Sequence, residues 1–241
     1  MLAALGAALL GLSIQDADRS GEAELREMVS AVGRARAVRI AISRRRVEEG
    51  FAYPEDATFW VDYVQPGVFK ILNNGVFGDG ELWVSDGKKI MRDRMEESTV
   101  EIGDAPASFL APGSPLQLSQ GMPLACALLD GEPGYGTLVA KTGPVTVSRE
   151  GSVVSFSFLV AGGGKALVEA RKENGGWTLH ATEFENEAQP GGGAFRGRTG
   201  ILRDAVVGWE PFSGKGRPVF QAVAPAGTTA VAFGTGRRFS G

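Results

Sequence analysis

The chain has 241 residues, a net charge of −3 and an apolar fraction of 43 %, which suffices for a buried core in one large domain. No basic excess argues for nucleic acid, and the sequence has no polyacidic tail. The single cysteine, Cys126, excludes an internal disulfide framework and a cysteine-based zinc site. The 35 glycines are spread between apolar runs, which favours many turns joining short strands.

The N-terminal segment "MLAALGAALLGLSIQ" has the length of the apolar region of a signal peptide and is too short to span a membrane. It lacks the basic residues that usually precede such a region, and no clean cleavage site follows. We interpret residues 1–20 as a signal peptide whose start is truncated or mis-assigned, which predicts export to the periplasm or cell envelope. The alternative is an N-terminal helix packed on the domain.

Residues 16–27, "DADRSGEAELRE", place oxygen-bearing side chains at the spacing of a calcium-binding EF-hand loop, including Asp16, Asp18, Ser20 and Glu27. Such loops normally occur in pairs, and the sequence has no second copy. The favoured interpretation is therefore an acidic helix start, where the helix dipole stabilises negative charge.

A helical pattern follows from Gly21. Leu25, Met28, Val29 and Val32 recur at the spacing of one apolar stripe, and Gly33 can end the helix. A stripe of this kind covers a sheet or a core.

The pattern then changes to the two-residue alternation of β-strands. Residues 115–131 interrupt the strands with one or two predicted short helices, broken at Gly121 and Pro123. In the Gly-rich tail from about residue 189, residues 218–225 and 230–233 are expected as late edge strands. The other predicted strands cover residues 37–43, 58–64, 68–72, 81–85, 88–94, 98–103, 137–141, 144–150, 152–160, 165–173 and 177–184.

The predicted architecture is mainly β (α+β): one helix, an antiparallel meander, a short helical insertion and a second meander. No domain boundary is visible, so residues 21–241 are expected to form one domain with a Gly-rich extension from about residue 189. An apolar concave sheet covered by helices would enclose a space.

Catalytic signatures are weak. His180 is the only histidine and lies on the polar side of a predicted strand, and no Gly-x-Ser-x-Gly motif supplies a nucleophile. Cys126 lies in an apolar run and is interpreted as a core residue. The basic run of residues 34–46 is interpreted as a solvated strand end, with docking of an acidic partner or anionic lipid as the alternative. We predict no enzyme activity, catalytic residue, metal site or cofactor.

An ordered set of motifs carries a family resemblance. Phe59-Trp60-Val61, Pro66, Phe69 and the turn Ser85-Asp86-Gly87-Lys88 follow one another as they do in the LolA/LolB-like superfamily of lipoprotein carriers, which residues 21–120 resemble. The resemblance implies a half-open antiparallel β-barrel with helices over its concave face, where acyl chains bind. The carriers have Arg before the proline, whereas this chain has Gln65, so the resemblance does not extend to their handover of lipoproteins. The motif positions considered are Gln65, Pro66, Asp86 and Gly87.

These observations predict non-catalytic binding and transport of a lipoprotein acyl chain or another hydrophobic ligand. Leu25 and Met28 are the predicted lid residues. The same side chains could instead fill a solid core, because strand alternation does not reveal which face is concave. The predicted wall residues are Trp60, Phe69, Ile71, Trp83, Met91, Phe156 and Phe158.

The expected partners are a lipid or an acylated protein, with a membrane-associated protein as a further option and no nucleic acid; the chain is expected to be a monomer. The alternative function is a lipoprotein-sensing module of the same fold that acts through a protein partner.

Overall fold

The computed structural model describes residues 21–34, 37–48, 51–75, 80–95, 97–109, 111, 114–116, 122–138, 143–160, 164–186, 200–212 and 218–233, with the backbone alone described at residues 48, 51–56, 137 and 186. Helices in this part of the chain span residues 21–34, α2 (Leu124–Leu129) and α3 (Glu132–Leu138). The strands are β1 (Val38–Glu48), β2 (Phe51–Gln65), β3 (Val68–Gly75), β4 (Glu81–Asp86), β5 (Lys89–Arg94), β6 (Thr99–Asp104), β7 (Thr146–Glu150), β8 (Val153–Leu159), β9 (Lys165–Glu173), β10 (Gly176–Asn186), β11 (Gly200–Pro211) and β12 (Thr229–Ala232).

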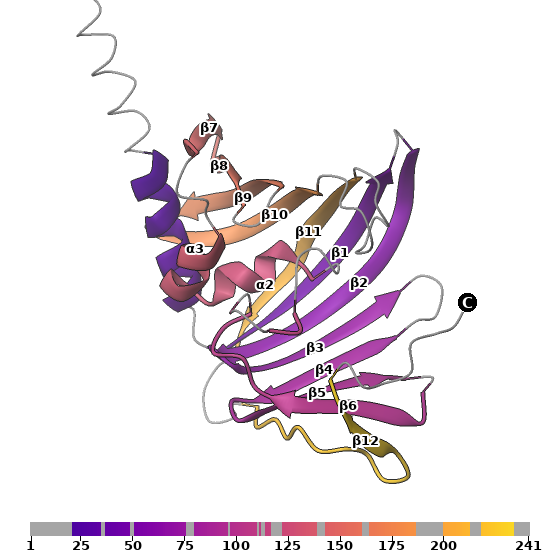
Figure 1. The fold of residues 1–241 in the computed structure, drawn as a ribbon. Coiled ribbons are helices and arrows are strands. Elements are labelled where there is room, and N and C mark those ends of the chain that lie inside the picture. Colours follow the sequence, from indigo (N-terminus) through magenta and orange to yellow (C-terminus); the bar gives the residue numbers. More distant parts are fainter. Residues whose placement is uncertain are drawn as a thin grey trace, which may run out of the picture.

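The strands form one 12-stranded sheet in the order β12-β6-β5-β4-β3-β2-β1-β11-β10-β9-β8-β7. Neighbouring strands are antiparallel except β12, which pairs with β6 in parallel. The sheet curves around the helices, and among the described residues its two end strands, β12 and β7, do not pair (Figure 1). The fold is therefore an open antiparallel β-barrel with helices over its concave face, as the sequence predicted.

Strand β11 is the main element that the sequence patterns missed. It lies between β1 and β10, near the middle of the sheet, and joins the two predicted meanders. Its alternation is interrupted where the register with β1 shifts, so that Ala41 pairs with Gly208 and Ile42 with Val206. This irregularity conceals the strand in a Gly-rich part of the sequence.

Three further segments differ from the predictions. Helix α3 includes residues 137–138, where the sequence predicted a strand. In the insertion of residues 115–131, where one or two short helices were predicted, the described residues are helical only at Leu124–Leu129. Residues 218–225 form no strand, whereas the edge strand expected at residues 230–233 is confirmed by β12. Residues 1–20 lie outside the described part of the chain.

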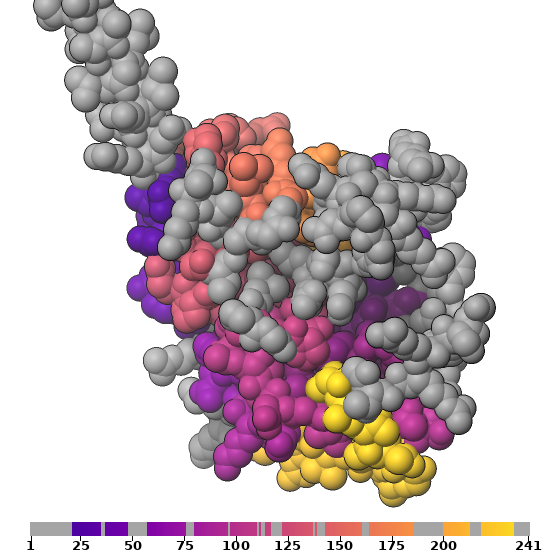
Figure 2. Space-filling view, in the orientation of Figure 1, coloured from indigo at the N-terminus to yellow at the C-terminus, as the bar shows by residue number. Residues whose placement is uncertain are grey.

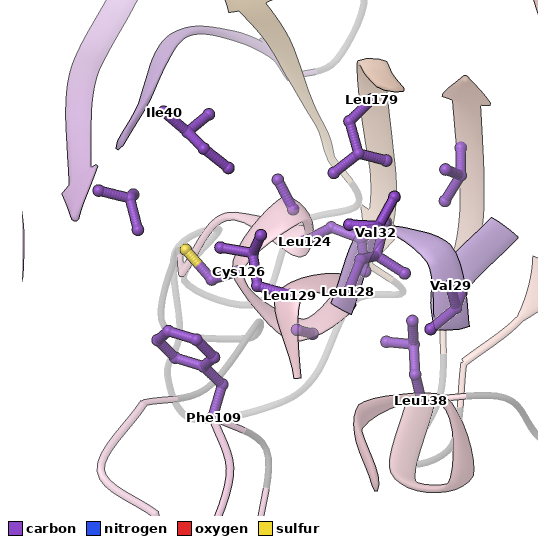
Figure 3. Packing of buried hydrophobic residues seen from close by; sticks show 14 of the residues in the cluster. Val29, Val32, Ile40, Phe109, Leu124, Cys126, Leu128, Leu129, Leu138 and Leu179 are labelled. Carbon is purple, nitrogen blue, oxygen red and sulfur yellow. The ribbon is translucent and has the colours of Figure 1, made fainter. Parts of the chain in front are cut away.

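The main apolar core lies between the helices and the sheet. Its helix side comprises Leu25, Met28, Val29 and Val32 from residues 21–34 together with all six residues of α2. Figure 3 shows this layer, with Val32 and the α2 leucines on one side and Leu179 of β10 and Ile40 of β1 on the other. The stripe predicted for the first helix is therefore confirmed as its buried face.

A second apolar cluster covers part of the opposite, convex face. There Val84, Met91 and Val100 from β4, β5 and β6 pack against Ala222, with Phe220 and Ala224 beside them. After this segment the chain turns along the sheet edge as β12, and its residues lie against β6 at one end of the molecule (Figures 1 and 2). Phe233 follows and stacks on Trp83, with ring centroids 5.9 Å apart.

Two glycines allow the helical segments to approach closely. A Cβ atom at Gly33 would lie 2.4 Å from the Cα of Gly131, and one at Gly134 would lie 2.1 Å from the carbonyl oxygen of Ala127. Both distances are too short for real Cβ contacts. The contact between α2 and α3 therefore requires Gly134.

Replacing Gly134 with Ala is expected to destabilise the protein by about 1–3 kcal/mol, because the clash is with rigid backbone. Gly136→Ala is the matched control in the same helix: a Cβ there meets nothing within 4 Å, so we expect a gain of about 0.5–1 kcal/mol. Denaturant unfolding of both variants measures the difference, and equal midpoints would contradict the packing described.

Candidate functional site

The face of the sheet that the helices cover, called here the helix-covered face, carries most of the predicted wall. Phe69 and Ile71 of β3, Trp83 of β4, and Phe156 and Phe158 of β8 are all buried in the main core. The predicted lid residues Leu25 and Met28 pack against the same core from the helix side. Seven of the nine predicted cavity residues thus gather on one side of the sheet, where they contact protein atoms.

The other two predicted wall residues lie on the convex face. Trp60 is opposite Ala41 in β1, alternating with Phe59 and Val61, and 45 % of its surface is exposed. Met91 pairs with Val84 in the second cluster. Because alternate residues of a strand point to opposite faces, neither side chain can reach the helix-covered face in this register.

The family-motif positions build two adjacent turns. Gln65 and Pro66 lead into the β2–β3 turn, and Asp86 and Gly87 form the β4–β5 turn. Asp86 accepts hydrogen bonds of 2.8 Å from the backbone N–H groups of Lys88 and Lys89, and the Lys89 bond contributes most to lowering its pKa. Gly87 has a φ of +88°, which favours glycine. These positions therefore fix hairpin geometry at one end of the sheet.

Polar contacts at the rim tie the first helix to its surroundings. Glu24 pairs with Arg149 of β7, and Glu27 pairs with Lys172 of β9 at 3.1 Å and accepts a 3.1 Å hydrogen bond from the indole of Trp177. The helix is therefore held by an apolar stripe within and by solvent-accessible ion pairs outside, and each such pair contributes little.

The residues considered for calcium are only partly described. Asp16, Asp18 and Ser20 lie outside the described residues, while Glu27 makes the two contacts above. Among the described residues no group of three or more potential metal ligands occurs, and no helix there is long and apolar enough to cross a membrane.

A buried ion pair lies on the helix-covered face. Arg44 of β1 and Asp204 of β11 face each other across the strands, with Nε–Oδ1 and Nη2–Oδ2 distances of 2.6 and 2.8 Å. Arg44 is only 3 % exposed and Asp204 only 2 %, and the guanidinium lies 4.6 Å from the centre of the Phe59 ring. The interpretation of residues 34–46 as a solvated strand end is thus wrong at Arg44.

Next to this pair lies a buried hydroxyl without a hydrogen-bond partner. Thr182 of β10 faces Asp204 in the register of β10 and β11, is 1 % exposed, and its Oγ1 makes no hydrogen bond. The neighbouring residue in β9 is Val168. A polar group of three side chains therefore interrupts the apolar surface of this part of the face.

A buried carboxyl group joins α2 to the sheet. Asp130, directly after α2, accepts hydrogen bonds from the backbone N–H of Phe109 and from the hydroxyl of Tyr63 in β2, the latter at 3.3 Å. Burial raises the pKa of Asp130 to about 7, although both hydrogen bonds act in the opposite direction. The Phe109 ring packs 4.6 Å from that of Phe69, so this contact anchors the loop before α2 on the sheet.

Charged residues occupy the end of the helix-covered face near β6. Arg92 pairs with Glu81 and Glu101, and its guanidinium lies 4.9 Å from the centre of the Trp83 ring. Trp83 is thus held between Arg92 and Phe233. This part of the face combines an aromatic side chain with paired charges.

The two groups considered for catalysis occupy ordinary structural positions. Burial raises the pKa of the Cys126 thiol, which disfavours the reactive thiolate, and the side chain belongs to the main core. His180 lies at a register irregularity between Leu179 and Ala181 and is partly exposed.

No family model and no curated protein matches the chain. Among solved structures, the chain is similar to a DUF1329 family protein from Desulfovibrio piger, with 11 % identity and a TM-score of 0.41 over 83 % of this chain and 95 % of that one. It is also similar to a LolA superfamily protein from Nitrosomonas europaea, with 10 % identity and a TM-score of 0.34 over 78 % of this chain and 94 % of that one. The second belongs to the superfamily that the sequence motifs resemble. The proposals below rest on this chain's own residues.

The buried Asp130 predicts an unusual pH dependence of stability. Its pKa is about 7 in the folded protein against an ordinary 3.8, so the folded state holds a proton that the unfolded state releases between these values. The stability contribution of Asp130 is therefore fully present below about pH 4 and is lost as the pH rises to about 7. Relative to Asp130→Asn, the free energy of unfolding should fall by up to about 1.4 kcal/mol per pH unit in this window.

Denaturant unfolding of both proteins between pH 4 and 8 measures this difference. Asp104→Asn is a control that should show no such fall in this range, because a hydrogen bond from Lys89 lowers the pKa of the exposed Asp104 and its contribution is therefore complete above about pH 4. A difference between wild type and Asp130→Asn that is constant or grows with pH would contradict the buried environment of this carboxyl group.

Proposed function

We propose that the protein binds an acyl chain or a comparable hydrophobic ligand between its helices and the helix-covered face, and carries it in the cell envelope without catalysing a reaction. The observation that carries the proposal is an unclosed sheet whose apolar face is covered by helices rather than by a second sheet or by closure of the barrel.

The chemistry of the cover supports exchange with such a ligand. The stripe of Leu25, Met28 and Val32 contacts the sheet through non-directional apolar packing. An acyl chain presents the same kind of surface, and its transfer from water contributes roughly 0.8 kcal/mol per CH₂ group. A ligand can therefore replace these apolar contacts without breaking any hydrogen bond made by the stripe itself.

The attachment of the first helix supports the same idea. Its polar contacts with β7, β9 and β10 lie at the rim, where exposed ion pairs contribute about 0.2–1 kcal/mol each. These ion pairs therefore add little to the cost of moving the helix, which its buried apolar stripe mainly determines and which a ligand can offset by covering the same surface.

Two sequence features support the cellular setting and the absence of catalysis. The apolar residues 1–15 resemble the core of a signal peptide, which favours the periplasm. Cys126 is buried within α2 and His180 lies in a strand irregularity apart from any nucleophile-like motif, which supports a binding protein rather than an enzyme.

Binding can be tested directly with a C16 acyl chain that carries an environment-sensitive fluorophore. The purified protein is expected to bind this probe saturably, with fluorescence that unlabelled acyl chains abolish by competition. Absence of binding, together with absence of lipid in native mass spectra of protein isolated from a cell envelope, would refute the proposal.

The double variant Glu24→Gln and Glu27→Gln is expected to increase the association rate of the probe by about two- to tenfold. The variant removes two ion pairs of the first helix, and their loss should favour movement of this helix away from the sheet by roughly that factor. The amide oxygen introduced at position 27 can still accept the hydrogen bond from Trp177. Stopped-flow fluorescence measures the rate. The control variant Asp104→Asn removes the exposed ion pair with Lys89 between β5 and β6 and should leave the association rate unchanged. Equal association rates in the double variant and the wild-type protein would exclude entry of the ligand under this helix.

A further inference from the structure

We propose that Thr182, with the adjacent Arg44–Asp204 pair, forms a binding subsite for the uncharged polar group of the ligand, and that Asp204 makes the protein select esters or amides of acyl chains over free fatty acids. This inference rests on the proposed function and specifies the chemical class of the ligand.

The subsite is defined by strand register. Thr182, Asp204 and Arg44 face one another on three adjacent strands, β10, β11 and β1, and Val168 and Ala57 extend the same row on either side. Val168 and Ala57 both belong to the main core. The three polar side chains therefore lie within the helix-covered face, beside apolar surface that suits an acyl chain.

The Thr182 hydroxyl supplies the recognition group. Its Oγ1 is buried and unpaired, and a buried polar group without a partner destabilises the folded protein. A hydroxyl can donate to the carbonyl oxygen of an ester or amide. A ligand that brings a carbonyl group to this row therefore recovers an interaction that an unsubstituted hydrocarbon cannot make.

The ion pair determines the charge that the subsite accepts. Both carboxylate oxygens of Asp204 accept a hydrogen bond from Arg44, which also has a further interaction partner, so the charge of this buried cation is already compensated. Arg46, on the same strand, also has an interaction partner, and burial keeps the nearby Cys126 thiol protonated. A free carboxylate would add an uncompensated negative charge beside Asp204, which a low-dielectric site strongly disfavours.

The chain contains a matched ion pair on its other face. Arg39 and Asp62 form the same bidentate arrangement, with distances of 2.6 and 2.9 Å between β1 and β2. The side chain of Arg39 is 47 % exposed, so water screens this pair. It therefore serves as an internal control with the same geometry in a different environment.

The first measurement compares two probes on the full chain at pH 8, a fluorescent C16 fatty acid and its methyl ester. We expect the wild-type protein to bind the ester at least tenfold more tightly than the ionised acid. Equal affinities, or tighter binding of the acid, would overturn the inference while leaving the proposed function intact. Binding of neither probe would instead refute the proposed function.

Asp204→Asn removes a negative charge from the subsite, so the ratio of ester to acid affinity should fall at least tenfold. Asp62→Asn, on the exposed pair, should leave the ratio unchanged. An unchanged ratio in a folded Asp204→Asn protein would overturn the role of Asp204.

Thr182→Val keeps the shape of the side chain and provides a test that does not disturb the ion pair. It should weaken ester binding about fivefold, in line with one net hydrogen bond, and should leave binding of a fluorescent alkane unchanged. Thr182→Ser keeps the hydroxyl and should restore ester affinity. Equal ester affinity in wild type and Thr182→Val would overturn the subsite.

The ester can belong to a glycerolipid or to an acylated polypeptide. Displacement of the bound ester probe by diacylglycerol and by a synthetic acylated peptide compares these sources. Displacement by either one supports the inferred class, and displacement by free fatty acid alone contradicts it.

Discussion

The apolar face of a sheet that does not close is the constraint on which the rest of this structure depends. Twelve strands curve toward a barrel, but β12 and β7 remain unpaired with each other in the described part of the chain. The face between them carries large side chains such as Phe69 and Phe156, which cannot be left in water. The helix of residues 21–34 and α2 provide the cover, and all six residues of α2 are buried as a result.

The same constraint explains why the proposed ligand site and the core consist of the same residues. Packing of an apolar helix stripe and packing of an acyl chain depend on the same removal of apolar surface from water. The difference lies in the polar groups, which hydrocarbon cannot satisfy. The proposed subsite of Thr182, Arg44 and Asp204 would therefore let the helix-covered face distinguish one apolar ligand from another.

Local sequence patterns predicted much of the fold. The stripe of Leu25, Met28 and Val32 predicted the covering helix, and two-residue alternation located most strands, because both patterns arise from burial on one side of an element. Alternation does not reveal which face the helices cover. Trp60 and Met91 were therefore included in the wall although their registers place them on the convex face.

The buried polar groups could not be predicted for a different reason. Arg44 belongs to a basic run, and its partner Asp204 lies 160 residues away. The strand of Asp204 has an irregular alternation, caused by a bulge, and lies in a Gly-rich part of the sequence. No local pattern connects the two, and only the fold decides that this pair, rather than Arg39 and Asp62, is removed from solvent.

The position of β11 also has a consequence for the order of folding. Residues 200–211 lie between β1 and β10, so the N-terminal and C-terminal meanders have no strand pairing with each other until this late segment is in place. Contacts between residues so far apart in sequence carry a large loop-closure cost and slow the search for the native state. During synthesis the sheet therefore remains in two separate halves until most of the chain has left the ribosome.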